Sequence, residues 1–357
     1  MLPLEELAKI LPRHAAALIT DPVSRRFLTG FPSSDGILFL SREEAVFLTD
    51  SRYIEAARAQ ITVCPVEELS AAPAEQLRKL CGRGHVRRLL LENKRTTLAQ
   101  AASYRKWLPG VCLEANSSAV DTALTRLRRS KTPAQVDSIR RAQRIAEAAL
   151  AAVLAEDLHV GMTERALALA LDYRMLRGGA EALSFETIAV AGENGSMPHG
   201  VPGERALRTG DLVTMDFGAV VEGWHSDMTR TIALGEPGEE QRRVYETVLA
   251  AQLAALACVR PGLPCKEADA AARAVITEAG YGEHFRHGTG HGVGLEIHEA
   301  PNLSLKSGGA LAPGDVVTVE PGVYLPGRCG VRIEDMVLIA EDGYENLTKA
   351  AKELLVV

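Results

Sequence analysis

One segment of the sequence occurs twice in related form in the second half of the chain. The copies are residues 210–218 and 314–322, and each runs from a Gly-Asp turn through an apolar stretch to a carboxylate and a glycine. Short apolar runs bounded by turn residues are typical of buried strands. The sequence therefore predicts two related half-domains, each built around a strand that ends in an acidic residue.

Each copy is followed, within the length of one hairpin, by a second carboxylate. Asp216 is followed by Asp227 in the first copy, and Glu320 is followed by Glu334 in the second. Pseudo-symmetry between the copies would bring these four carboxylates together. Because burying four carboxylates is prohibitive unless cations compensate them, the set indicates a functional site rather than four solvated strand ends.

A glycine-rich segment, residues 285–298, adds three histidines: His287, His291 and His298. The spacing of His287 and His291 fits a helical metal-binding pair, but the interleaved glycines favour an extended backbone instead. Four carboxylates and about one imidazole suit two adjacent divalent ions. Oxygen-rich ligation favours manganese or a similar ion over a cysteine-type zinc centre.

Length and charge exclude several other classes of protein. A chain of 357 residues predicts two domains, and a net charge of −6 gives no electrostatic reason to expect nucleic acid as a partner. We expect the one dense basic stretch, residues 126–131, to be solvated surface. No apolar run approaches the ~18 residues that span a bilayer, so no membrane partner is expected.

The N-terminal residues and the cysteines favour a cytoplasmic protein. Residues 1–14 carry Glu5 and Glu6 and lack a long apolar run, so they do not resemble a signal peptide. The six cysteines are scattered without a paired spacing, which favours a reduced protein.

Hydrophobic patterns divide the chain near residue 126. The first part alternates expected strands (residues 36–40, 45–49, 61–66 and 86–91) with expected helices (residues 72–80 and 98–108). A capping box at Thr132-Pro133-Ala134-Gln135 opens a helix to about Glu156. Further helices are expected from Thr163 to Gly178, from Gly238 to before Pro261, and after Pro264.

An ordered set of motifs resembles the pita-bread metallopeptidases, most closely their aminopeptidase P and prolidase branch. The first domain is similar to the creatinase-type N-terminal domain of that branch at residues 48–53. The motifs of the second domain are residues 197–200, 215–218, 226–231, 287–294, 319–322 and 331–335. The resemblance implies a mixed α/β (α+β) fold with a creatinase-like domain at 1–125 and a pita-bread catalytic domain with an internal pseudo-twofold repeat at 126–357. It also implies a homodimer.

The resemblance assigns a role to each matched position. The metal ligands would be Asp216, Asp227, His291, Glu320 and Glu334. They would hold two divalent ions, expected to be Mn²⁺ with Co²⁺ or Zn²⁺ as alternatives, and Asp227 would bridge both. The bridging hydroxide would attack the carbonyl, and Glu320 would act as its general base.

Four further positions match residues around the metal ions. His199 and His298 would contact the scissile carbonyl and stabilise the intermediate, while His287 and Arg332 would support the metal shell. We do not assign a role to His225, which falls outside the matched positions.

The resemblance implies peptide substrates with proline at the second position. Dipeptide-specific prolidases often carry an arginine where this chain has Asn302, and an amide cannot replace the ionic clamp that arginine offers a carboxylate. We therefore expect an Xaa-Pro aminopeptidase, with an Xaa-Pro dipeptidase as the alternative.

Two more distant alternatives stay open. Methionine aminopeptidases share the metal shell but usually lack an N-terminal domain of this size. Non-catalytic binding proteins and metal-free creatine hydrolases of the same fold typically lose metal ligands, whereas all five ligand positions are kept here.

Overall fold

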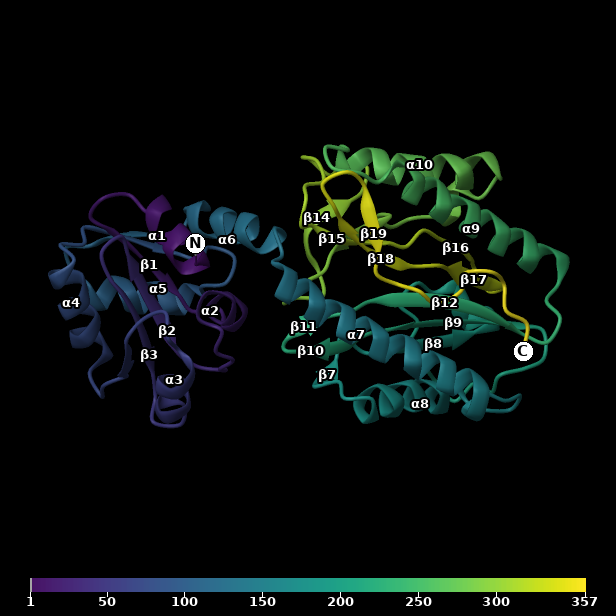
Figure 1. The fold of residues 1–357 in the computed structure, drawn as a ribbon, viewed down its shortest axis with the longest axis horizontal. Coiled ribbons are helices and arrows are strands. Elements are labelled where there is room, and N and C mark those ends of the chain that lie inside the picture. The colour runs from purple at the N-terminus through teal and green to yellow at the C-terminus, as the bar shows by residue number, and fades with distance from the viewer. Residues whose placement is uncertain (1) are drawn as a thin grey trace. The chain divides into compact units, whose positions relative to one another are not determined.

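The computed structural model describes residues 2–357 and divides into two compact units (Figure 1). The first unit ends at Arg128 and the second comprises Arg129–Val357. Met1 lies outside the described residues. Both units mix helices and strands, as the sequence predicts. No helix in the described part of the chain is both long and apolar enough to cross a membrane.

The first unit is built on one mixed sheet with the strand order β4-β3-β2-β1-β5-β6. Its strands are β1 (Ala15–Ile19), β2 (Ile37–Ser41), β3 (Ala45–Thr49), β4 (Val66–Glu68), β5 (Arg88–Leu91) and β6 (Cys112–Glu114). Its helices are α1 (Pro3–Ile10), α2 (Pro22–Thr29), α3 (Ile54–Gln60), α4 (Pro73–Arg83), α5 (Leu98–Trp107) and α6 (Ala119–Arg129).

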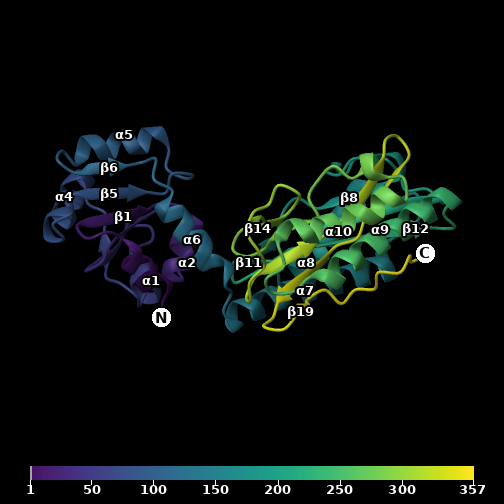
Figure 2. The same ribbon diagram turned by 90° about the horizontal axis from the view of Figure 1, so that it is seen from above.

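The central strands of this sheet, β1, β2, β3 and β5, are largely apolar on both faces, which is why helices cover both sides. Along β1, Ala17 and Ile19 pack in one core cluster with residues of α1 and α2, while Ala16 and Leu18 pack in another with residues of α4 and α5. Figure 2 shows α5 on one side of the sheet and α1 and α2 on the other. Buried strands of this kind read as continuous apolar runs.

Most expected elements of the first unit are present, but one strand was placed wrongly. The expected strand at residues 45–49 is β3, whereas the strand expected at 61–66 begins only at Val66. Ile61 caps the end of α3, and both Ile61 and Val63 pack against the core from a loop. Buried apolar loop residues give the same local pattern as a short strand, which explains the error.

The second unit contains two helix pairs and several small sheets. Its helices are α7 (Pro133–Ala152), α8 (Glu164–Arg177), α9 (Glu239–Cys258) and α10 (Cys265–Glu278), with short helical turns η1 (Val153–Asp157), η2 (Gly192–Ser196) and η3 (Gly282–His284). Its strands are β7 (Ala182–Leu183), β8 (Ile188–Ala191), β9 (Asp211–Phe217), β10 (Ala219–Val221), β11 (Trp224–His225), β12 (Met228–Leu234), β13 (Gly290–Gly292), β14 (Glu299–Leu303), β15 (Val316–Val319), β16 (Gly322–Leu325), β17 (Cys329–Arg332), β18 (Asp335–Ile339) and β19 (Tyr344–Asn346).

The expected internal repeat is present and extends well beyond the duplicated segment. Helices α7 and α9 both have 20 residues, and α8 and α10 both have 14. The turn before α8 is closed by a hydrogen bond from Gly161 N to Leu207 O, and the turn before α10 by one from Gly262 N to Leu311 O, both of 2.8 Å. Each half therefore repeats the order helix, turn, helix, strand.

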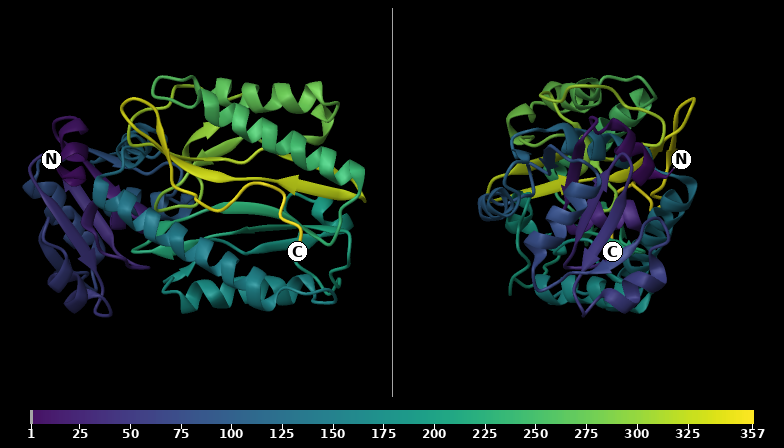
Figure 3. Two further views of the ribbon diagram at one scale, coloured as in Figure 1. Left: turned by 45° about the vertical axis from the view of Figure 1, so that its right-hand side comes forward. Right: turned by 90° about the vertical axis from the view of Figure 1, so that its left-hand side faces the viewer.

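The two halves place their strands between the two helix pairs. Helices α7 and α8 pack in one core cluster with residues of β8, β9 and β12, and α9 and α10 pack in another with residues of β15, β17 and β18. Figure 3 shows the strands between the green pair α9 and α10 and the teal pair α7 and α8. The acidic strands of both halves thus face each other inside the unit.

The basic stretch at residues 126–131 is only partly solvated, so that expectation was wrong for two of its members. Arg129 donates to the buried carboxylate of Asp315, with an Nη2–Oδ2 distance of 2.5 Å, and the side chain of Lys131 is fully buried beside Glu299. Asp315 opens the second copy of the repeat, and Arg205 pairs in the same way with Asp211 in the first. A buried carboxylate needs such a partner.

We expect loss of the Arg129–Asp315 pair to destabilise the second unit. Arg129→Ala should lower its free energy of unfolding by about 2–4 kcal/mol, because Asp315 would stay buried without its cation. Arg260→Ala is the matched control, since Arg260 is an exposed residue of the same unit, and it should change this free energy by less than about 0.5 kcal/mol. Urea unfolding followed by Trp224 fluorescence in a Trp107→Phe background reports on this unit alone. Equal midpoints for the two variants would contradict the expectation.

Candidate metal centre

A cavity of about 690 Å³ lies in the second unit and is lined by all nine residues predicted for the site. Every residue of its wall belongs to that unit, and apolar side chains such as Phe185 and Ile188 contribute to the wall as well. The predicted residues in the wall are His199, Asp216, Asp227, His287, His291, His298, Glu320, Arg332 and Glu334. The structure therefore brings together residues that are spread over more than a hundred positions of the sequence.

The carboxylates come from equivalent places in the two halves. Asp216 lies in β9, which pairs antiparallel with β12 so that Asp216 is opposite Thr229. Glu320 directly follows β15, which pairs with β18 in the same manner. Asp227 precedes β12 and Glu334 precedes β18. The duplicated hairpins thus deliver one pair of carboxylates from each half.

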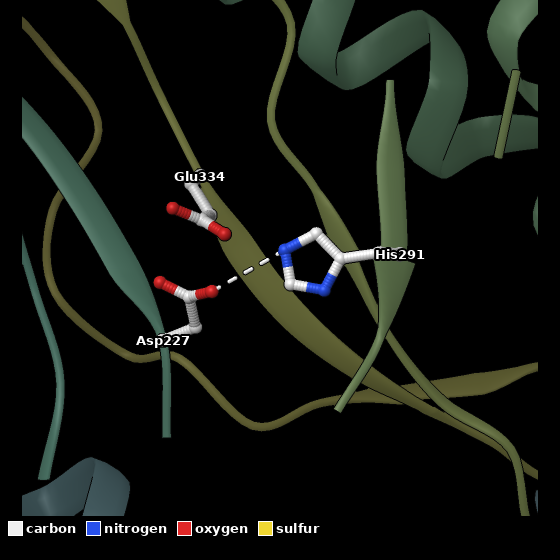
Figure 4. A group of neighbouring side chains, drawn as sticks. All are labelled: Asp227, His291 and Glu334. Carbon is white, nitrogen blue, oxygen red and sulfur yellow. Dashed lines mark ion pairs between the residues drawn. The ribbon is translucent and has the colours of Figure 1, made fainter. Parts of the chain in front are cut away.

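Three side chains of the cavity form a close group. Ligand atoms of Asp227, His291 and Glu334 all lie within 4.8 Å of one another, and all three residues are buried. Figure 4 shows the two carboxylates and the imidazole pointing toward one another. His291 Nε2 lies 3.4 Å from Asp227 Oδ2 and 3.4 Å from Glu320 Oε1. The carboxylate of Glu320 therefore lies close enough to bind the same metal ion as these three side chains.

The orientation of His291 is fixed by its second ring nitrogen. Nδ1 donates a hydrogen bond to the carbonyl oxygen of Gly292 at 3.1 Å, and the backbone N–H of His291 donates to Thr318 Oγ1. In the neutral ring, Nε2 then presents a lone pair toward two carboxylate oxygens. A cation bound at Nε2 would stabilise this arrangement. Metal-binding histidines are usually oriented in this way, by a hydrogen bond from the ring nitrogen that does not bind the metal.

The carboxylate cluster lacks enough positive charge from the protein itself. Burial, reinforced by the charges of neighbouring carboxylates, raises the pKa of Asp227 and Glu334 well above the usual range. Burial also raises the pKa of Glu320. Asp216 Oδ1 is buried and has no hydrogen-bond donor. Divalent cations would supply both the missing charge and a partner for this oxygen.

Arg332 is the arginine of the cavity wall, and its donors are already engaged. Its Nη2 lies 2.6 Å from Asp216 Oδ2, and its Nε donates to Thr229 Oγ1 at 3.1 Å. Its Nη1 donates to Tyr324 OH at 2.8 Å and to the carbonyl oxygen of Pro198 at 3.3 Å. Arg332 therefore fixes the second oxygen of Asp216 and leaves the first one open.

Tyr324 belongs to this network and was missed in the sequence. Burial raises its pKa to about 12, so it remains a neutral phenol. Its OH accepts from Arg332 and lies 3.0 Å from His287 Nε2. A Cβ atom on Gly322 would lie 2.5 Å from the same OH, so the glycine two positions earlier leaves the room that the ring needs. That Gly-x-Tyr spacing after Glu320 is the signal that could have identified it.

His287 supports this network and is not placed to bind a metal. Its Nδ1 donates to Gly288 O at 2.8 Å, so its Nε2 accepts from Tyr324 OH. Burial lowers its pKa to about 4, which keeps the ring neutral.

The two remaining histidines face the open part of the cavity. The His298 ring lies 4.4 Å from the His291 ring, measured between centroids. Burial, aided by the neighbouring His291, lowers the pKa of His298, so a neutral imidazole is available there. His199 is exposed to the cavity. Both can contact a ligand without displacing a member of the carboxylate cluster.

Two nearby polar residues lie outside the cavity wall. His225 bonds to Ser184 through its Nδ1 at 2.8 Å. Asp335, which follows Glu334, is buried on the other side of the strand and pairs with Arg230 and Lys352.

Comparison with known proteins places the chain in a family. The family model described as "Metallopeptidase family M24" matches residues 137–341, more than half of the chain, and "Creatinase/Prolidase N-terminal domain" matches residues 12–130. The expected creatinase-like first domain and metallopeptidase second domain are thereby confirmed.

Relatives and solved structures agree with these matches. An Xaa-Pro dipeptidase of Pyrococcus furiosus is 45% identical over 236 residues, covering 66% of this chain and 68% of that protein. The structure of an Xaa-Pro dipeptidase from Bacillus anthracis superposes with a TM-score of 0.95 at 37% identity, covering 99% of both chains. An X-Pro aminopeptidase from Thermotoga maritima gives a TM-score of 0.89 at 33% identity, covering 96% of this chain and 97% of that one.

We expect Asp227→Asn to weaken Mn²⁺ binding by about 100-fold or more, because an amide replaces a charged ligand at the centre of the cluster. Glu186→Gln is the matched control, since Glu186 is an exposed carboxylate of the cavity wall outside the cluster. Isothermal titration of metal-stripped protein measures both. Mn²⁺ binding by Asp227→Asn at the wild-type affinity would contradict the assignment of this site.

Proposed function

We propose that this chain, which belongs to metallopeptidase family M24, is an Xaa-Pro aminopeptidase that releases the N-terminal residue from peptides with proline at the second position. The observation that carries the proposal is the buried group of Asp227, His291 and Glu334, which opens onto a cavity with two further histidines. Relatives and structural neighbours named for Xaa-Pro hydrolysis support the type of bond.

Two divalent ions, with Mn²⁺ as the first choice, fit the residues of the site. The proposed ligands are Asp216, Asp227, His291, Glu320 and Glu334. Their oxygen-rich chemistry suits a hard or borderline cation. The buried, unpartnered Asp216 Oδ1 and the undercompensated carboxylates support this choice. When bound, such ions would lower the pKa of a shared water and polarise the scissile carbonyl.

Glu320 is the proposed general base. It directly follows β15, and its Oε1 accepts from Thr318 Oγ1 at 3.3 Å, which fixes the carboxylate at the edge of the cavity. A carboxylate within hydrogen-bond reach of the attacking water can take its proton and pass it to a leaving nitrogen. In Xaa-Pro cleavage, the group that receives this proton is the imino nitrogen of proline.

His199 and His298 supply hydrogen-bond donors for the reacting carbonyl. Both line the cavity, and the lowered pKa of His298 makes it a neutral donor at ordinary pH. A donor aimed at the developing oxyanion stabilises mainly the transition state. The apolar side chains of Phe185, Ile188 and Ile297 line the same cavity and suit an apolar proline ring.

The charge balance of the cavity favours peptides longer than two residues. Arg332 is the one arginine or lysine among the described residues of the wall, and it is engaged by Asp216 and Tyr324. Asn302, exposed in the wall, has no charge to offer. A dipeptide would place its carboxylate inside the cavity without a cationic partner, which costs free energy, whereas a longer peptide places a neutral amide there.

We expect the Mn²⁺-loaded protein to cleave an Xaa-Pro-Yaa tripeptide with a higher kcat/KM than the matched Xaa-Pro dipeptide, and the metal-stripped protein to cleave neither. Asn302→Arg should shift the preference toward the dipeptide, because arginine can pair with its carboxylate. Release of the N-terminal residue measures both rates.

The outcomes separate the alternatives. A wild-type preference for the dipeptide would identify an Xaa-Pro dipeptidase. Mn²⁺ binding without cleavage of either peptide would identify a non-catalytic member of the family.

We expect His298→Ala to lower kcat by about 100-fold while Mn²⁺ binding stays unchanged, because the variant loses a donor to the transition state and keeps every proposed ligand. His225→Ala is the matched control, since this histidine lies in the same unit and bonds to Ser184 instead of lining the cavity. Steady-state kinetics with the tripeptide and an Mn²⁺ titration test it. An unchanged kcat for His298→Ala would remove this residue from the mechanism.

A further inference from the structure

Glu164 is a fully buried carboxylate that lies outside the cavity and has no assigned role. It is the first residue of α8, and its exposed fraction is 0%. Oε1 accepts from Ala191 N at 2.9 Å and from Asn194 Nδ2 at 3.1 Å. Oε2 accepts from Asn194 Nδ2 at 3.0 Å and from Gly203 N at 3.1 Å. One side chain thus collects donors from three separate points of the chain.

These three points bracket the segment that carries His199. Residues 191–203, called the His199 segment below, leave the end of β8, pass through η2 and return to the start of α8. Two backbone bonds close the segment beside Glu164: Glu164 N donates to Arg205 O and Arg165 N to Gly203 O, both at 3.0 Å. Closing a loop of this length costs conformational entropy, and the shared carboxylate offsets part of that cost.

The middle of the His199 segment lies between the Glu164 contacts at Asn194 and Gly203 and is held there by contacts of its own. The carbonyl oxygen of Pro198 accepts from Arg332, and a Cβ atom on Gly200 would lie 3.0 Å from Val190 Cγ1. The His199 side chain itself is exposed to the cavity, so its position follows from the backbone that carries it. A small shift of that backbone moves the imidazole relative to the substrate carbonyl, which can lower a rate strongly.

The chemistry at Glu164 requires a carboxylate and not merely a polar side chain. All of its contacts are N–H donors, and an ionised carboxylate can only accept. Hydrogen bonds from N–H groups to a charged acceptor are short and strong, which offsets the cost of burying the charge. Glutamine has the same shape, but its amide would direct N–H groups at the backbone N–H of Ala191 or Gly203.

We infer that Glu164 is a positioning residue for hydrolysis, which holds the His199 segment so that His199 meets the substrate carbonyl. The inference rests on the proposed function, because it acts through a histidine that contacts substrate in that proposal. If Glu164 acts through His199, its loss should lower kcat only when His199 is present. If its loss merely destabilises the protein, kcat should fall equally with and without His199.

A double-mutant cycle with Glu164→Gln and His199→Ala tests the inference on the full-length, Mn²⁺-loaded protein. With the Xaa-Pro-Yaa tripeptide, Glu164→Gln should lower kcat by about tenfold or more in the wild-type background. In the His199→Ala background, the same change should alter kcat by less than about twofold, because the two residues act as one unit. Mn²⁺ affinity should be unchanged in all four proteins.

Two further variants sharpen the test. Asn194→Ala removes one of the three donors and leaves the carboxylate satisfied by the backbone, so it gives a milder cycle if Glu164→Gln does not fold. It should show the same dependence on His199. Glu204→Gln is the control for charge loss next to the same segment, since Glu204 is 74% exposed and pairs with the exposed Arg165. It should leave kcat unchanged.

The results that would overturn the inference are distinct from those that would overturn the function. Equal losses of kcat in the wild-type and His199→Ala backgrounds, or a loss of Mn²⁺ affinity in Glu164→Gln, would give Glu164 a general structural role. A wild-type protein that binds Mn²⁺ and cleaves neither peptide would contradict the proposed function itself.

Discussion

The mutual repulsion of four buried carboxylates is the constraint on which the second unit depends. Asp216, Asp227, Glu320 and Glu334 line one cavity, and burial and neighbouring charges raise the pKa of the last three. A single arginine, Arg332, compensates one oxygen of Asp216 and leaves the other without a donor. A protein retains such an arrangement when it binds cations, because the free energy of folding alone opposes it.

The duplicated architecture is how the chain assembles this cluster. Each half contributes a hairpin with two carboxylates, and each half opens its hairpin with an aspartate held by an arginine. The second half alone supplies His291, which requires close approach of two strands: a Cβ atom on Gly290 would lie 2.0 Å from Thr318 O. The two repeated hairpins therefore supply the four carboxylates. Residues that are not repeated supply the imidazole of His291 and the proposed contacts to substrate.

Sequence patterns predicted those features whose cause is local or repeated. The capping box at Thr132, the helices of the second unit and the two acidic strands all follow from short-range signals, and the structure contains each of them. Tyr324 and Glu164 were missed because their importance comes from contacts with residues far away in the chain. The run of basic residues predicts solvated surface for Lys131, which is wrong because the run does not reveal a buried partner such as Glu299. The features that the sequence does not predict are therefore those that depend on contacts between residues far apart in the chain.

The central claim is that cations compensate this cluster, and the most direct test locates them. Crystals of metal-stripped protein soaked in Mn²⁺ can be measured at a wavelength where manganese scatters anomalously. We predict two anomalous peaks inside the carboxylate cluster, both in contact with Asp227. A cluster without any peak, with manganese bound only at other places, would contradict it.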